Sequence, residues 1–253
     1  MIKKSFLILV VLAVLLLSFT NEVVAEPDFP IPNLDFNIRP AESQEEVALS
    51  LQLLFILTVL SLAPAILIMV TSFTRIVIVL SFTRGAIGTQ QMPPNQVLIG
   101  LALFLTFFIM FPVITEINED ALNPYVAPEI NQNEALDKAV QPIRKFMFKH
   151  TREKDLALFL KISEIDNPIH IEDIPTSSLI PAFIISEMKT AFQMGFFLYV
   201  PFLIIDMVVA STLMSMGMMM LPPVMISLPF KILLFVMVDG WNLIIRSLLL
   251  SFN

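Results

Sequence analysis

The sequence predicts an all-α integral membrane protein, in which two kinked helical hairpins are separated by a small helical soluble domain. The first observation is composition: 57% of the 253 residues are hydrophobic and 15% are charged, whereas soluble chains average about 45–50% and about 25%. The second observation is the distribution of charge. Between Leu49 and Thr115 the charged residues are Arg75 and Arg84, and five charged residues follow Met188. Apolar stretches with so few charges are typical of segments that lie in lipid.

The composition also excludes several classes of function. Acidic residues outnumber basic residues by 22 to 15, which argues against a nucleic-acid partner. The sequence has no cysteine and two histidines, so disulfides, thiolate chemistry and a histidine-rich metal centre are not expected. No phosphate-binding, dinucleotide-binding or zinc-protease motif is present. We therefore expect neither an enzyme nor a cofactor.

The N-terminal region is expected to lie outside the fold. Residues 1–25 have two early lysines, an apolar run of about 12 residues and small residues before a polar break, which is typical of a secretory signal peptide. The alternative is an uncleaved first helix. Cleavage would remove two lysines and one glutamate, change the net charge from −7 to −8 and leave the new N-terminus outside the cytoplasm. Residues 26–48 form an acidic leader, whose four prolines forbid a continuous helix.

Four apolar segments follow the leader and form two pairs. The first hairpin, 49–115, contains segments at 49–82 and 97–114, and the second hairpin, 181–253, contains segments at 196–216 and 224–250. Four crossings return the C-terminus to the outside. Each segment carries one proline, which is expected to kink its helix: these are Pro64, Pro112, Pro201 and Pro229. Lipid does not satisfy the freed carbonyls, so neighbouring protein must cover them.

The 65 residues between the pairs, 116–180, hold 12 of the 22 acids and are expected to form an extracytoplasmic helical domain. Apolar residues at three- and four-residue steps predict a helix that starts at Asn133, which Pro142 should kink or split. A second helix is expected over 152–165. The domain is too small for a large core of its own, so it should dock on its neighbours or on other copies. His150 and His170 are interpreted as surface histidines.

Three charged residues lie inside the apolar segments of the second hairpin: Asp206, Lys231 and Asp239. Such charges often mark a transport pathway. The alternative is structural, because Asp206 can pair with Lys231, and Asp239 with Arg246, to fix helix register. Arg75 is expected to extend toward the membrane surface from a helix end.

Two stretches of the second hairpin carry most of the information. Residues 181–196 place Glu187 and Lys189 among phenylalanines that include Phe183 and Phe192, which favours an amphipathic interface helix. Residues 201–241 hold six methionines between Met214 and Met225. Methionine is flexible and fits irregular surfaces, so Met218, Met219 and Met220 would form an apolar constriction if several copies faced one axis. The alternative is ordinary core packing or lipid contact.

Both stretches resemble the FliP family of flagellar type III export proteins, which is related to the SctR family of virulence injectisomes. The likeness extends from about residue 45 to the C-terminus. It is carried by Pro181-Ala182-Phe183, Ser186-Glu187, Phe192-Gln193-Met194-Gly195, Pro201-Phe202 with Asp206, and Met216-Gly217-Met218-Met219-Met220.

The resemblance implies a ring or cone of several copies, for which the family suggests five, assembled with FliQ-like and FliR-like subunits and other export apparatus proteins. Unfolded flagellar subunits would pass through its centre at the flagellar basal body in the bacterial inner membrane. The family's methionine gasket carries over onto Met218, Met219 and Met220.

Two other classes remain open from the residues. A proton-coupled small-solute transporter would use Asp206, Lys231 and Asp239 as its relay. An assembly scaffold would use the hairpins only to hold other subunits together.

Overall fold

A computed structural model describes residues 44–89, 91–163, 173–218 and 220–252. The predicted signal peptide (1–25), most of the leader (26–48) and His170 lie outside these residues. The described part of the chain is helical and contains no strand, which confirms the predicted all-α class. In chain order the elements are α2 (Gln44–Val70), α3 (Phe73–Ile87), α4 (Asn95–Ile117), a π-helical turn η1 (Asn118–Leu122), α5 (Asn123–Val126), α6 (Gln132–His150), α7 (Glu153–Ile162), α8 (Thr176–Ser215), α9 (Pro223–Met237) and α10 (Gly240–Leu250).

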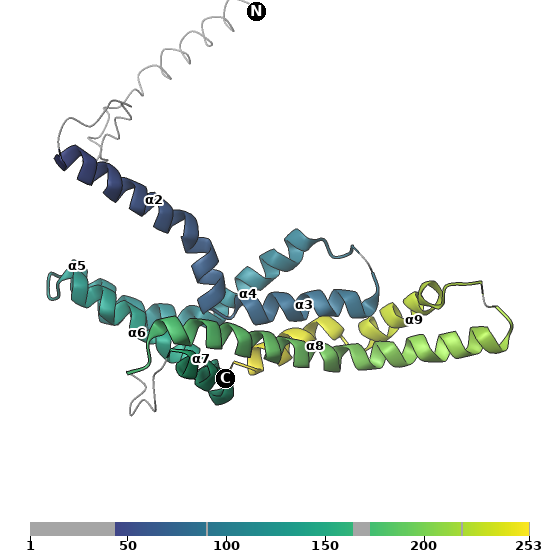
Figure 1. Cartoon of the computed structure of the whole chain (residues 1–253). Helices are drawn as coiled ribbons and strands as arrows, with labels where there is room; N and C mark the ends of the chain where they lie inside the picture. Colours follow the sequence, from purple (N-terminus) through teal and green to yellow (C-terminus); the bar gives the residue numbers. More distant parts are fainter. Residues whose placement is uncertain (1–43, 90, 164–172, 219, 253) are drawn as a thin grey trace, which may run out of the picture. The chain divides into compact units, whose positions relative to one another are not determined.

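The chain divides into two compact units, Met1–Gln52 and Leu53–Asn253. The described part of the first unit is the start of α2, and the features below belong to the second unit. There, α3 packs along α8, and α6 and α7 also pack against α8 (Figure 1). The expectation that the segment between the hairpins docks on its neighbours is thus confirmed. The division into two hairpins and a separate domain remains a prediction.

Three of the described helices are long and apolar enough to cross a membrane: Ser50–Val70, Asn95–Val126 and Thr176–Ser215. A fourth span results if α9 and α10, which meet at a bend of 62°, are counted together. At about 1.5 Å per residue, the 40 residues of α8 extend for about 60 Å. This helix is about twice as long as the hydrocarbon core of a bilayer, about 30 Å.

The structure corrects two predicted boundaries. Residues 181–196 and the segment 196–216 are one helix, α8, which continues through Pro181 and Pro201. The first apolar segment, 49–82, forms two helices, because α2 ends at Val70 and α3 begins at Phe73. Pro64 lies inside α2 and does not end it. Between the two helices, the Thr71 hydroxyl accepts a hydrogen bond from the Phe73 amide, at 3.4 Å. Threonine hydroxyls offer the backbone such local partners, which compete with helical hydrogen bonds.

The two helices expected in segment 116–180 are present with small changes. Helix α6 begins at Gln132, where the Asn131 side chain caps it by accepting a hydrogen bond from the Glu134 amide at 3.0 Å. Pro142 lies inside α6 and does not split it. Helix α7 runs from Glu153 to Ile162, within the predicted 152–165.

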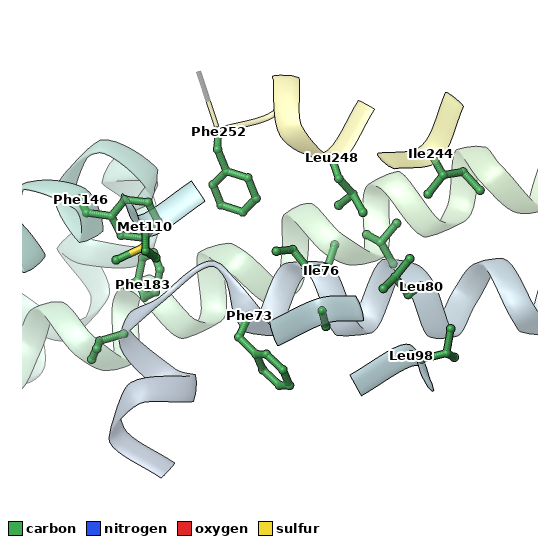
Figure 2. Close-up of a cluster of buried hydrophobic side chains, with 14 of the residues drawn as sticks. Phe73, Ile76, Leu80, Leu98, Met110, Phe146, Phe183, Ile244, Leu248 and Phe252 are labelled. Carbon is green, nitrogen blue, oxygen red and sulfur yellow. The ribbon is translucent and has the colours of Figure 1, made fainter. Parts of the chain in front are cut away.

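The core lies where α3, α8, α10 and α6 meet. Figure 2 shows Ile76 and Leu80 of α3, Ile244 and Leu248 of α10, and the aromatic rings of Phe146, Phe183 and Phe252 in one buried cluster. Ile76, Leu80, Phe183 and Leu248 are fully buried. The approach of α8 to α3 requires a glycine, because a Cβ atom on Gly195 would lie 2.6 Å from Cγ of Phe82.

Candidate functional site

The methionine-rich turn begins where α8 ends. Gly217 has a φ of +74°, which favours glycine because other side chains rarely adopt it. Its amide donates to the Met214 carbonyl at 3.1 Å, and the Met218 amide donates to the Leu213 carbonyl at 3.0 Å. This pair of hydrogen bonds is the Schellman motif, which ends a helix and satisfies its last carbonyls. The sequence Met-Gly-Met therefore fixes the place at which the chain leaves α8, and Pro222 then precedes α9.

The methionines of this turn are exposed in the single chain. Met220 is 98% exposed and Met218 is 43% exposed. Met214, Met216 and Met225, which flank them, are each more than 60% exposed. Met219 lies outside the described residues. The turn stands at the end of α8 that is remote from α6 and α7 (Figure 1). Core packing within one chain therefore does not account for Met218 and Met220.

Below the turn, Asp206 of α8 and Lys231 of α9 form an ion pair. Lys231 Nζ lies 2.6 Å from Asp206 Oδ2, and Ser227 Oγ donates to Asp206 Oδ1 at 2.5 Å. Lys231 is 4% exposed and Ser227 is fully buried. Ser227 and Lys231 are four residues apart, so they share one face of α9. The pair joins α8 to α9 and compensates both charges inside the apolar segments.

Asp239, the third predicted intramembrane charge, lies at the bend between α9 and α10. It has a φ of +50°, is exposed and makes no side-chain capping hydrogen bond to α10. In the described part of the chain, Asp239 and Arg246 form no salt bridge. The alternative in which these two residues pair within one chain is therefore wrong. One cause is spacing, because seven residues of helix separate them by about 10 Å.

Arg75 and Glu187 form a buried ion pair between α3 and α8. Arg75 Nε donates to Glu187 Oε2 at 2.9 Å, and Arg75 Nη2 donates to Oε1. Arg75 Nη1 donates to the Ser251 carbonyl at 2.8 Å and to Ser251 Oγ at 3.0 Å, while the guanidinium carbon lies 3.8 Å from the centre of the Phe252 ring. Arg75 is 3% exposed and Glu187 is fully buried. The expectation that Arg75 extends to the membrane surface is wrong, because it lies in the core.

The other residues of the 181–196 motif have different environments. Phe183 is fully buried in the core cluster, whereas Phe192 is 52% exposed and its ring lies 5.2 Å from that of Phe82 in a T-shaped contact. Lys189 Nζ pairs with Asp155 Oδ1 of α7. Phe183 and Glu187, which were predicted to lie at an interface, are buried inside the chain. For Lys189 and Phe192, the interface role remains a prediction.

Asp155 is a buried acceptor that joins α7 to α8. The Ser186 hydroxyl donates to Asp155 Oδ2 at 2.9 Å, and the same hydroxyl accepts from the Arg152 amide at 3.0 Å. Burial raises the pKa of Asp155, but the hydrogen bonds from Lys189 and Ser186 outweigh it and hold the pKa below its ordinary value. The carboxylate therefore stays charged and holds the two helices together.

His150 is expected to make the folded chain sensitive to mild acid. Its ring lies 4.8 Å from that of Phe146 and 5.2 Å from that of Phe252. Burial, followed by the charges of Arg75 and Lys149, lowers the pKa of His150 from 6.5 to about 4. The unfolded chain then binds more protons than the folded chain between these values, so stability falls as the pH falls from about 6.5 to about 4. His150→Phe keeps an aromatic ring and should flatten the change in Tm over this range, measured in detergent. An unchanged slope would rule out His150 as its source.

Sequence reasoning assigned no polar contact to four residues that make such contacts: Ser186, Ser227, Ser251 and Asp155. The signal for Ser227 is its four-residue spacing from Lys231 on one helix. Asp155 lies in the first turn of α7, where the helix dipole favours acidic residues in general. Its position therefore gives no separate signal of a contact with α8. Among the residues that the structure describes, no three His, Asp or Glu side chains are grouped to hold a metal ion.

The chain matches known proteins over most of its length. Residues 56–248 match the model of the FliP family. The flagellar biosynthetic protein FliP of Bacillus subtilis is 64% identical over 216 residues, which are 85% of this chain and 98% of that protein. The proteins of the same name from Aquifex aeolicus and Pectobacterium carotovorum are 55% and 54% identical, each over 81% of this chain, and the aligned regions cover 86% and 79% of those proteins. The chain therefore belongs to the FliP family.

Proposed function

We propose that this protein is a pore-forming subunit of the flagellar protein export gate in the bacterial inner membrane. Several copies would surround a central channel through which unfolded flagellar subunits leave the cytoplasm. Membership of the FliP family supports this proposal, because its relatives are flagellar biosynthetic proteins. The observation that carries the pore assignment is the exposed methionine turn at the tip of a helix too long for the bilayer.

The lengths of the helices argue for assembly with other protein. Helix α8 extends for about 60 Å, and the candidate span Asn95–Val126 extends for about 48 Å. A bilayer core of about 30 Å does not cover either helix completely. In the apolar 18-residue stretch that makes α8 a candidate span, and in that of Ser50–Val70, 6% of the residues are buried within the chain. The remaining apolar surface needs a partner, and copies of the same chain around an axis provide one.

The methionine turn supplies the seal in this proposal. Thioether side chains are apolar and flexible, so a ring of them excludes water when closed and adapts to a passing polypeptide. Met218 and Met220 are exposed in the turn that follows α8 and are not among the buried core residues. Around a common axis, Met218, Met219 and Met220 from each copy would form the gasket.

The partners follow from the same assembly. FliQ-like and FliR-like subunits and other export apparatus proteins would complete the ring, for which five copies of this chain are expected. The gate would have no catalytic residue, since its role is to form and close a path. The energy for transport would come from the proton gradient and from an ATPase elsewhere in the apparatus.

Replacing Met218, Met219 and Met220 together with alanine tests the gasket. The smaller side chains should leave the constriction open to water, so cells that express the variant should leak ions while the complex still assembles. The measurement is membrane conductance or ion-sensitive growth, together with the mass of the purified complex. Alanine at Met207 and Met237, which are 62% and 76% exposed elsewhere on the helices, is the matched control.

The outcome separates three functions. Leakage from an intact complex supports a gate. A proton-coupled solute transporter that uses Asp206, Lys231 and Asp239 should lose little when these methionines change, and a scaffold should lose nothing. An assembled triple variant that conducts no more than the control variant would refute the gasket.

A further inference from the structure

A groove of about 560 Å³ lies between α4, α6 and the C-terminal end of the chain. Its apolar wall includes Phe108, Phe111 and Pro112 of α4 together with Phe252, and its polar rim includes Lys145 and Lys149 of α6. Sites that hold small ligands have volumes of about 300–1,000 Å³. The methionine turn takes no part in lining this groove and stands at the end of α8 that is remote from α6 (Figure 1).

The groove changes from apolar to polar along its length. Phe108 and Phe111 belong to the apolar part of α4 and are 68% and 57% exposed. Five residues after Phe111, α4 reaches Glu116, its first acidic residue, which also lines the groove. The candidate span changes there from residues suited to hydrocarbon to residues suited to water. A ligand that follows the groove must therefore be amphiphilic.

The polar rim carries excess positive charge. Lys145 and Lys149 are four residues apart on α6, so both point to the same side of that helix, while Glu116 supplies the one acid of the rim. Lys145 Nζ lies 3.2 Å from Glu116 Oε1, and these side chains are 76% and 40% exposed. Exposed pairs of this kind are weak, so a stronger anion can displace the carboxylate. Lys149 Nζ donates to the Phe252 carbonyl at 3.3 Å, a neutral acceptor, and Lys149 forms no salt bridge with any residue that the structure describes.

We propose that this groove binds an anionic phospholipid. The acyl chains would lie along Phe108, Phe111 and Pro112, and the phosphate would lie between Lys145 and Lys149. Basic rims beside membrane-spanning helices recognise acidic headgroups in this way. His150, which also lines the groove, is neutral at pH 7 and supplies an aromatic wall.

The test uses the purified full-length complex in a non-ionic detergent, stripped of lipid by extended washing. Dioleoyl-phosphatidylglycerol or dioleoyl-phosphatidylcholine is added back, and native mass spectrometry counts the lipids retained per chain. We expect preferential retention of phosphatidylglycerol, reduced about tenfold in the double variant Lys145→Gln/Lys149→Gln. The matched control, Lys154→Gln/Lys161→Gln, removes two lysines of α7 that do not line the groove and should bind as the unmodified protein does.

Each alternative occupant gives a different result. Glycerol phosphate, which has the headgroup without acyl chains, should not compete with the lipid; full competition would reduce the groove to a phosphate site and overturn the proposal. Equal retention of the two lipids, or equal loss in both double variants, would also overturn it. No retained lipid in the intact complex would mean that a second copy covers the groove. None of these outcomes bears on ion leakage through the methionine turn, so the proposals fail separately.

Discussion

Glu187→Ala is expected to destabilise the folded chain by about 3–5 kcal/mol, the range for removing one partner of a buried ion pair. The reason is the position of Arg75, which is 3% exposed and would keep its charge without a carboxylate. Its remaining partners, the Ser251 carbonyl and hydroxyl and the Phe252 ring, are neutral. The measurement is the Tm of the detergent-solubilised protein, together with its abundance in the membrane.

Two further variants separate charge from geometry at this pair. Arg75→Lys keeps the charge but loses the two-pronged contact with Glu187, so it should also destabilise. The double variant Arg75→Met/Glu187→Met replaces both charges with apolar side chains and should recover part of the loss. A Glu187→Ala protein with the Tm of the unmodified chain would contradict the interpretation that this pair joins α3 to α8.

The fold class was predictable from the sequence because it depends on local properties. Apolar runs and sparse charge identify the helical segments, and the Met-Gly-Met sequence marks the end of α8, since Gly217 alone among these residues readily adopts a φ of +74°. The boundaries were less predictable at prolines. Pro201 was expected to kink the segment 196–216, but α8 continues through Pro201 and also through Pro181. A proline leaves one carbonyl of the preceding turn without its donor, so its cost depends on donors that the segment's own sequence does not reveal.

Pairing between distant residues was only partly predictable. Asp206 and Lys231 lie on helices joined by a short turn, so their pairing was among the alternatives. Arg75 and Glu187 are 112 residues apart, and no spacing rule links such positions. Arg75 appeared suited to a membrane surface because it lies near the end of a predicted segment. The break before Phe73 instead places it in the first turn of α3, against α8 and the C-terminal residues.

The variants Asp206→Asn and Lys231→Met distinguish a structural ion pair from a proton relay. Lys231→Met leaves the Asp206 carboxylate with the Ser227 hydroxyl as its partner, and an unpaired charge in an apolar span costs about 2.5–3.5 kcal/mol. Each single variant should therefore lower the Tm and the amount of assembled complex. In the double variant neither residue is charged, so its defect should be smaller than that of Lys231→Met alone.

A proton relay predicts the opposite pattern for the same two single variants and their double variant. If protons moved through Asp206, the double variant would lose transport as completely as Asp206→Asn does, whatever its stability, because the group that binds the proton would be absent. Export of flagellar subunits and the Tm must therefore be measured in all four proteins. The geometry favours the structural pattern, since Lys231 is 4% exposed and its ammonium lies 2.6 Å from the carboxylate. Recovery of both stability and export in the double variant would establish that the pair holds α8 against α9 below the methionine turn and carries no protons.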